Sequence, residues 1–248
     1  MRLLPLENPD DTNSEASVRG AFPKTRWSMV LDAQDGDPAA LATLCGAYWF
    51  PLYCYACRKG MPDPEDVVQS FFERLLSRDV LGHARRERGK LRSFLLRAFT
   101  NFAAEEWRKH GAQKRGGGRP LLEIDGLSAE ERYALEPDHG ETPELEYERA
   151  WARELLRAAL ERLRAAYEAA GNGSIFGALR ERLAGSEEDV SYQAIAASLG
   201  MSEGAIRFAA FKLRQRYRAT LQEIVAETVT GMDEVEAELA HLRNLFHK

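Results

Sequence analysis

Cysteine is scarce in this sequence. The chain has three cysteines in 248 residues, Cys45, Cys54 and Cys57. An odd and small number excludes a domain held together by a framework of disulfides. Cys54 and Cys57 have the spacing of zinc and redox motifs, but a zinc site needs four ligands and the nearest histidine is His83. Since the cysteines recur at helical spacing among aromatic residues, we expect them to be small core residues.

Long apolar runs are also missing. No run approaches the roughly 18 residues that a membrane-spanning helix needs. The first eleven residues lack the apolar centre of a signal peptide. Together with the few cysteines, this predicts a cytoplasmic protein that contacts no membrane.

Neither sign of charge is in large excess. The chain has 34 Lys and Arg against 39 Asp and Glu, a net charge of −5, which excludes a uniformly basic protein that coats nucleic acid. The charge is nevertheless arranged in blocks. Segment 82–119 has eleven basic and three acidic residues, and segment 120–150 has ten acidic and two basic residues. Adjoining blocks of opposite sign indicate a boundary between segments with different roles.

Motifs for catalysis or cofactor binding are not recognisable. The three glycines at 116–118 follow Lys114 but lack the strand and the Gly-Lys-Ser/Thr end of a phosphate-binding loop. Glu106 and His110 are four residues apart, yet no second Glu-x-x-His completes a di-iron bundle. No pairing of a nucleophile with a base stands out. We therefore expect no enzyme activity, no cofactor and no metal.

Helical periodicity fills most of the chain, without strand-like alternation. An aspartate that can cap a helix, followed by proline, signals a helix start at Asp37-Pro38 and at Asp63-Pro64. Thr142-Pro143 is a similar signal for a later helix. Pro51 should kink or break the first of these helices. The pattern predicts a flexible arm at 1–26, a helical domain at 27–110, a flexible linker at 111–142, a second helical domain at 143–222 and a C-terminal helical extension at 223–248.

Residues 191–218 predict a helix-turn-helix and read SYQAIAASLGMSEGAIRFAAFKLRQRYR. Gly200 permits the tight turn, Ala196 is small where two helices would cross, and Ser202 caps the second helix. After Glu203 this helix has no acid, and its cations are Arg207, Lys212, Arg214, Arg216 and Arg218. Such a helix is typical of DNA recognition, with base edges read near its start and phosphates held along it. The competing interpretation is a solvated basic helix of a bundle.

Three segments resemble extracytoplasmic-function sigma factors, a subfamily of the sigma-70 family. Residues 191–221 are similar to region 4, DPEDVVQSFFERLL at 63–76 resembles the region 2 helix that docks on polymerase, and 88–118 resembles the helix that melts promoters and reads the −10 element. The resemblance implies an all-α fold with a region 2 helical bundle and a region 4 helix-turn-helix joined by a flexible linker. It also implies core RNA polymerase (β′ clamp helices and β flap) and promoter DNA as partners. Whether an anti-sigma protein binds stays open.

The resemblance assigns expected roles to three groups of residues. The residues expected to dock on polymerase are Asp66, Gln69, Glu73 and Arg74. Those expected to bind −10 DNA are Arg92, Asn101, Trp107, Arg108, Lys109, Lys114 and Arg115, with Trp107 as the stacking residue. Those expected to bind −35 DNA are Ser202, Glu203, Arg207, Phe211, Lys212, Arg214 and Arg216. Phe-Ala-Ala-Phe at 208–211 departs from the more polar run of the family and moves the expected readout to Arg207 and Phe211.

Several segments lie outside the family pattern: the arm, the long linker, residues 167–190 and the tail after 222. We expect the acidic stretch at 120–150 to follow the RNA-exit path of the polymerase, and the helix at 232–247 to regulate or mask DNA binding. Two alternatives stay open. The chain could be a polymerase-independent helix-turn-helix regulator, or a helical adaptor that binds only protein.

Overall fold

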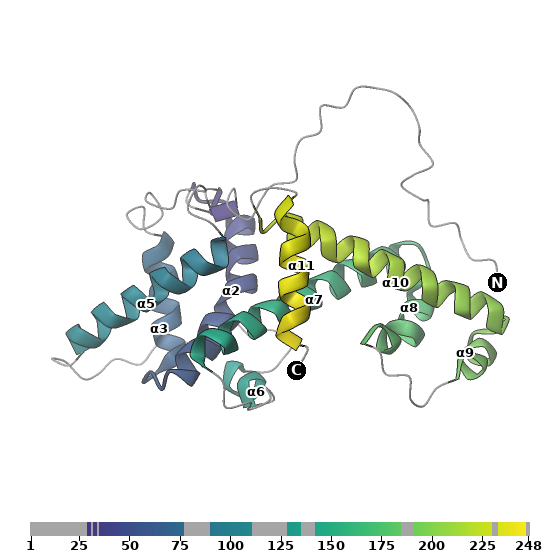
Figure 1. Ribbon diagram of the computed structural model, residues 1–248, viewed down its shortest axis with the longest axis horizontal. Helices are drawn as coiled ribbons and strands as arrows, with labels where there is room; N and C mark the ends of the chain where they lie inside the picture. Colours follow the sequence, from purple (N-terminus) through teal and green to yellow (C-terminus); the bar gives the residue numbers. More distant parts are fainter. Residues whose placement is uncertain are drawn as a thin grey trace, which may run out of the picture. The chain divides into compact units, whose positions relative to one another are not determined.

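The computed structural model describes residues 29–30, 32–33, 35–76, 90–110, 128–134, 142–184, 191–229 and 233–246. Within these residues every regular element is a helix, which confirms the all-α prediction for this part of the chain (Figure 1). None of the described helices combines the length and the apolar character needed to cross a membrane. The predicted arm and most of the predicted linker lie outside the described residues.

The helices form two compact units. Among the described residues, one unit is continuous and runs from Leu156 to Ile224, whereas the other is discontinuous and combines those at 29–155 with those at 225–246. Each boundary lies inside an uninterrupted helix, α7 (Pro143–Ala169) or α10 (Glu203–Ala226). This division differs from the predicted domain boundaries at 142 and 222. The first half of α7 joins the N-terminal helices because it buries Tyr147 and Trp151 in their core.

Three helices make the centre of the discontinuous unit: α2 (Pro38–Arg58), α3 (Pro64–Leu76) and α5 (Leu91–His110), which contact one another. Asp37 caps α2 by accepting a hydrogen bond from the Ala39 amide at 2.9 Å. The prediction was a kink or a break at Pro51, and the helix is continuous through this residue, which excludes the break. Proline costs a helical hydrogen bond, and here Pro51 and its neighbours on both sides are buried, which offsets that cost.

The apolar faces of α3 and α5 meet in this core. Phe71 of α3 lies 5.2 Å from Phe99 and 5.7 Å from Phe102 of α5, between ring centroids. The Phe71–Phe99 pair is edge-to-face, the arrangement that the charge distribution of aromatic rings favours. The helical spacing seen in the sequence therefore corresponds to a shared aromatic core.

A short helix, α6 (Ala129–Ala134), lies within the predicted flexible linker. Ser128 and Glu131 cap it reciprocally, with the Glu131 amide donating to Ser128 Oγ and the Ser128 amide donating to Glu131 Oε2. The Arg132 guanidinium lies 3.7 Å from the ring centroid of Phe50 and pairs with Glu154 at 2.5 Å. Part of the predicted linker is thus helical, and side chains on α6 contact α2 and α7.

The continuous unit contains the rest of α7, α8 (Gly173–Leu179), the 3-10 helix η2 (Arg180–Ala184), α9 (Tyr192–Leu199) and α10. Ser191 caps α9 and Ser202 caps α10, each through its hydroxyl oxygen. Gly200 adopts a left-handed conformation with φ of 64°, which joins the two helices tightly. One apolar core holds the unit together: Leu163, Tyr167, Ile175, Phe176, Leu179, Ile195, Ala196, Ile206, Ala209, Ala210 and Leu213. The predicted pair of helices joined at a glycine turn is confirmed.

Candidate nucleic-acid interface

The solvent-facing side of α10 is the candidate interface in the continuous unit. Ile206, Ala210 and Leu213 point into the core and are almost fully buried. Phe208 and Phe211, on the other side, are 56% and 57% exposed. Between residues 204 and 222 the helix has five cations and no acid. The core therefore fixes one face of α10 and leaves a basic face, with two aromatic rings, in contact with water.

Arg207 lies at the start of this face. Its Nη2 and Nε donate to Glu203 Oε1 at 2.7 and 2.9 Å, one turn earlier in the helix. Both side chains are well exposed, so the ion pair contributes little stability and water screens it. The guanidinium group is therefore accessible to a stronger anion such as a phosphate or to the acceptor edge of a guanine.

Three arginines gather around Tyr192, the first residue of α9. The Cζ atoms of Arg182 and Arg207 lie 4.4 and 5.0 Å from its ring centroid. Burial raises the pKa of the Tyr192 hydroxyl, but hydrogen bonds and positive charge from Arg214 and Arg182 outweigh it, and the pKa is lowered. The lowered pKa reflects the positive potential at this corner of the unit.

Arg182 is the residue of this cluster that the sequence did not identify. It belongs to η2, within the segment 167–190 that lies outside the family pattern. No local motif marks it, because its position over the Tyr192 ring brings together two elements, η2 and α9, that lie ten residues apart at these side chains.

The other residues predicted to bind −35 DNA lie on α10 or at its cap. Ser202 accepts from the Ala205 amide at 3.2 Å, so its hydroxyl serves the cap. The Nζ atom of Lys212 lies 5.8 Å from the Phe208 ring centroid. Arg214 bonds to Tyr192, and Arg216 is half-buried near Tyr167. Lys212 thus lies beside Phe208, whereas Arg214 is close to Tyr192 and Arg216 is close to Tyr167.

The residues predicted to bind −10 DNA are only partly described. Asn101 is exposed on α5. Trp107, Arg108 and Lys109 belong to the last turns of α5, but their side chains lie outside the described part of the structure. Lys114 and Arg115 also lie outside it. For this group the structure places the helix that would carry the interface and two of its side chains, those of Asn101 and Arg92.

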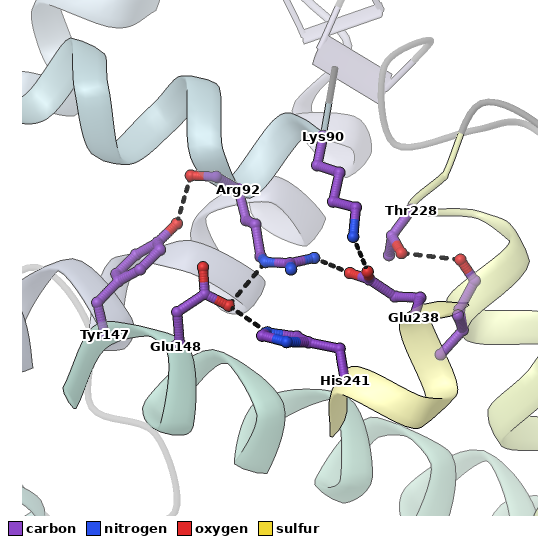
Figure 2. A network of polar contacts seen from close by, with 8 residues as sticks. Lys90, Arg92, Tyr147, Glu148, Thr228, Glu238 and His241 are labelled. Carbon is purple, nitrogen blue, oxygen red and sulfur yellow. Dashed lines mark hydrogen bonds and ion pairs between the residues drawn. The ribbon is translucent and has the colours of Figure 1, made fainter. Parts of the chain in front are cut away.

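Arg92 lies inside the discontinuous unit (Figure 2). Its side chain is 6% exposed, and its Nε donates to Glu148 Oε2 of α7 at 2.8 Å. A second ion pair joins it to Glu238 of α11 (Asp233–Phe246), and its guanidinium stacks 4.3 Å from the Trp151 ring centroid. Arg92 therefore does not face the solvent at a surface open to DNA, contrary to its predicted position.

The groups around Arg92 extend this ionic network. Lys90 pairs with Glu238, and burial together with the charge of Arg92 lowers the pKa of the Lys90 amine. His241 Nε2 lies 3.0 Å from Glu148 Oε2, and the Tyr147 hydroxyl donates to the Arg92 carbonyl at 2.9 Å (Figure 2). The network connects three helices, α5, α7 and α11.

The residues predicted to dock on polymerase lie on α3. Gln69 donates to Glu73 at 3.2 Å, and Asp66 is half-buried in the first turn. Arg74 pairs with Glu105 of α5 at 2.8 Å, with both side chains 42% exposed. These four polar side chains are partly exposed to solvent, while the opposite side of α3 packs into the core.

All three cysteines lie on α2, where Cys54 is a core residue, as predicted, whereas Cys45 and Cys57 are only partly buried. Cys54 is fully buried, and burial raises the pKa of the Cys45 thiol to about 11. Among the described residues, no group of three or more His, Cys, Asp or Glu side chains is placed to hold a metal ion.

The basic, partly aromatic face of α10 is suited chemically to bind a polyanion. Cations supply attraction to phosphates, and the two phenylalanine rings supply apolar contact. Comparisons of the chain with protein-family models, with curated proteins and with solved structures gave no match.

Proposed function

We propose that the chain is a sigma factor of the extracytoplasmic-function type, which binds core RNA polymerase and directs transcription from specific promoters. The observation that carries the proposal is the basic outer face of α10 on a helix-turn-helix core. The resemblance of 63–76 and 88–118 to the region 2 helices is the reason for proposing core RNA polymerase as a partner. A second candidate, a polymerase-independent DNA-binding regulator, is supported by the same face of α10.

In this mechanism α10 enters the major groove of the −35 element. Arg207 and Phe211, near its start, meet base edges, while Lys212, Arg214 and Arg216 hold phosphates. Phosphate contacts fix the register, and base contacts select the sequence. Arg182 and Arg207, beside Tyr192, add positive charge where the backbone would pass.

The discontinuous unit would act on polymerase and on the −10 element. Asp66 and Gln69 on α3 offer polar groups to the β′ clamp helices. Asn101 and Trp107 on α5 are of the types that capture an unstacked base, by edge hydrogen bonds and by stacking. Lys109 and its basic neighbours would neutralise the displaced strand.

The decisive experiment is competition with a housekeeping sigma factor for core RNA polymerase. The full chain is expected to compete, and the double variant Asp66→Ala, Gln69→Ala is expected to bind at least tenfold more weakly. Glu236→Ala, an exposed change on α11, is the control and should compete like the original chain. Absence of polymerase binding at micromolar concentration, with duplex DNA still bound, would favour the polymerase-independent regulator.

Arg207→Ala separates both DNA-binding candidates from a helical adaptor that binds only protein. We expect it to weaken binding to a duplex selected from a random library by about tenfold, since a base or phosphate contact from arginine contributes about 1–3 kcal/mol. Arg164→Ala, which removes another exposed arginine from α7 of the same unit, is the charge-matched control. Equal losses in the two variants would mean that net charge alone drives binding.

A further inference from the structure

Phe208 and Phe211 expose about half of their surface on α10. They are three positions apart in the sequence, so both rings project from the same side of the helix. In the described part of the chain, Phe246 is the other large apolar side chain with comparable exposure, at 45%. The core of the continuous unit is complete without these two rings, because Ile206, Ala210 and Leu213 fill it. Neither ring is therefore required for folding, and together they form an apolar contact surface.

The surroundings of this apolar pair indicate the chemistry of its partner. Arg207 and Lys212 flank it, the latter with its Nζ 5.8 Å from the Phe208 ring centroid. A second copy of the chain would bring the same cations against these, which disfavours self-association. Duplex DNA instead combines phosphates with a regular series of apolar points, the 5-methyl groups of thymines in the major groove.

We infer that Phe208 and Phe211 read thymine 5-methyl groups on neighbouring base pairs. The inference rests on the proposed DNA binding by α10 and names what that helix recognises. A rise of 1.5 Å per residue separates the two side chains by about 4.5 Å along the helix, close to the spacing of about 3.4 Å between stacked base pairs. A phenyl ring accepts the methyl group of thymine, whereas at a C·G pair it faces an amine that it leaves without a hydrogen bond. The preferred site should therefore contain adjacent thymines.

Deoxyuridine tests this inference, because it differs from thymidine only by the 5-methyl group. The full chain, alone and with core polymerase, is measured on a duplex selected from a random library, with each thymine replaced in turn. At two neighbouring positions the replacement should lower affinity by roughly fourfold each, the value of one buried carbon group. Phe208→Ala and Phe211→Ala should each bind the original duplex more weakly and lose the penalty at one position. Phe246→Ala, on α11, is the matched control and should retain both penalties.

The possible outcomes separate the inference from the proposed function. Binding to the duplex that is indifferent to deoxyuridine at every position would overturn the inference and leave DNA binding by α10 intact. If the chain binds no duplex, with or without polymerase, both the inference and the proposed DNA binding by α10 are wrong. If the alanine variants keep the deoxyuridine penalties but bind polymerase more weakly, the two rings contact protein, and the inference is wrong. Equal thermal unfolding of all variants establishes that the fold is unchanged.

Discussion

Arg92 and Glu238 are almost inaccessible to water, although both side chains are charged groups. Removing charges from water is costly, and only pairing and hydrogen bonding offset the cost. The network supplies two carboxylates, Glu148 and Glu238, for the two cations Lys90 and Arg92. Loss of any one partner should therefore lower the stability of the unit, because it leaves a buried charge uncompensated. Replacing all the charged groups together by apolar side chains should cost less stability.

Replacing Glu238 with alanine should leave Arg92 buried with incomplete compensation. We expect the free energy of unfolding to fall by about 3–5 kcal/mol, the usual cost of breaking a buried ion pair. Urea unfolding followed by tryptophan fluorescence measures it. Glu236→Ala, two residues away and exposed, should change it by less than about 0.5 kcal/mol. A similar small loss for both variants would mean that the network contributes little stability.

Local sequence identified the residues whose partners are close in the chain. The caps at Thr142 and Ser202 were predicted, because each hydroxyl serves an amide three residues later. The burial of Arg92 was not predictable, because its carboxylate partners lie at 148 and 238 on two other helices. The same limit applies to Arg182.

At the scale of helices, periodicity predicted the long elements and missed one short element. The stripes of α3, α5 and α10 repeat over enough turns to be recognised. The six residues of α6 are too few for a period, and they follow a segment rich in glycine and proline. The sequence signal that could have found α6 was the spacing Ser128-x-x-Glu131, which closes a capping box.

The capping box gives a test of how α6 is held. Ser128→Ala removes a helix cap that contributes about 1 kcal/mol, so amides of 129–134 should exchange with solvent roughly fivefold faster. Hydrogen exchange with mass spectrometry measures this. Ser191→Ala, which removes the equivalent cap of α9, should accelerate exchange in α9 and leave α6 unchanged. Unaltered exchange in α6 after Ser128→Ala would show that the contacts of Arg132 hold it without the cap.

For the whole molecule, the division into units does not follow the order of the chain. Residues 156–224 form one unit, while α11 belongs with helices formed from residues before 156. The four tryptophans, at positions 27, 49, 107 and 151, all precede residue 156. Tryptophan fluorescence therefore reports on the part of the chain to which α11 contributes Glu238, and the continuous unit is silent in this measurement.

A variant that ends at residue 229 lacks α11 and should unfold at a lower temperature. The expected decrease is several degrees or more, because Arg92 and Lys90 lose Glu238 and the buried side chains of Val235, Leu242 and Leu245 are removed. Thermal unfolding followed by tryptophan fluorescence gives the midpoint. A variant ending at residue 246 keeps the helix and serves as the control. Equal midpoints would mean that α11 is not an integral part of the unit.

The discontinuous unit also has a consequence for synthesis on the ribosome. Arg92 is translated 146 residues before Glu238, an interval of roughly 7–30 s at ordinary rates of bacterial translation. Throughout that interval the nascent chain contains α5 without the carboxylate that completes its ionic network. The ribosome must therefore release α11 before the discontinuous unit can complete its native fold. The end of translation then determines when this unit finishes folding.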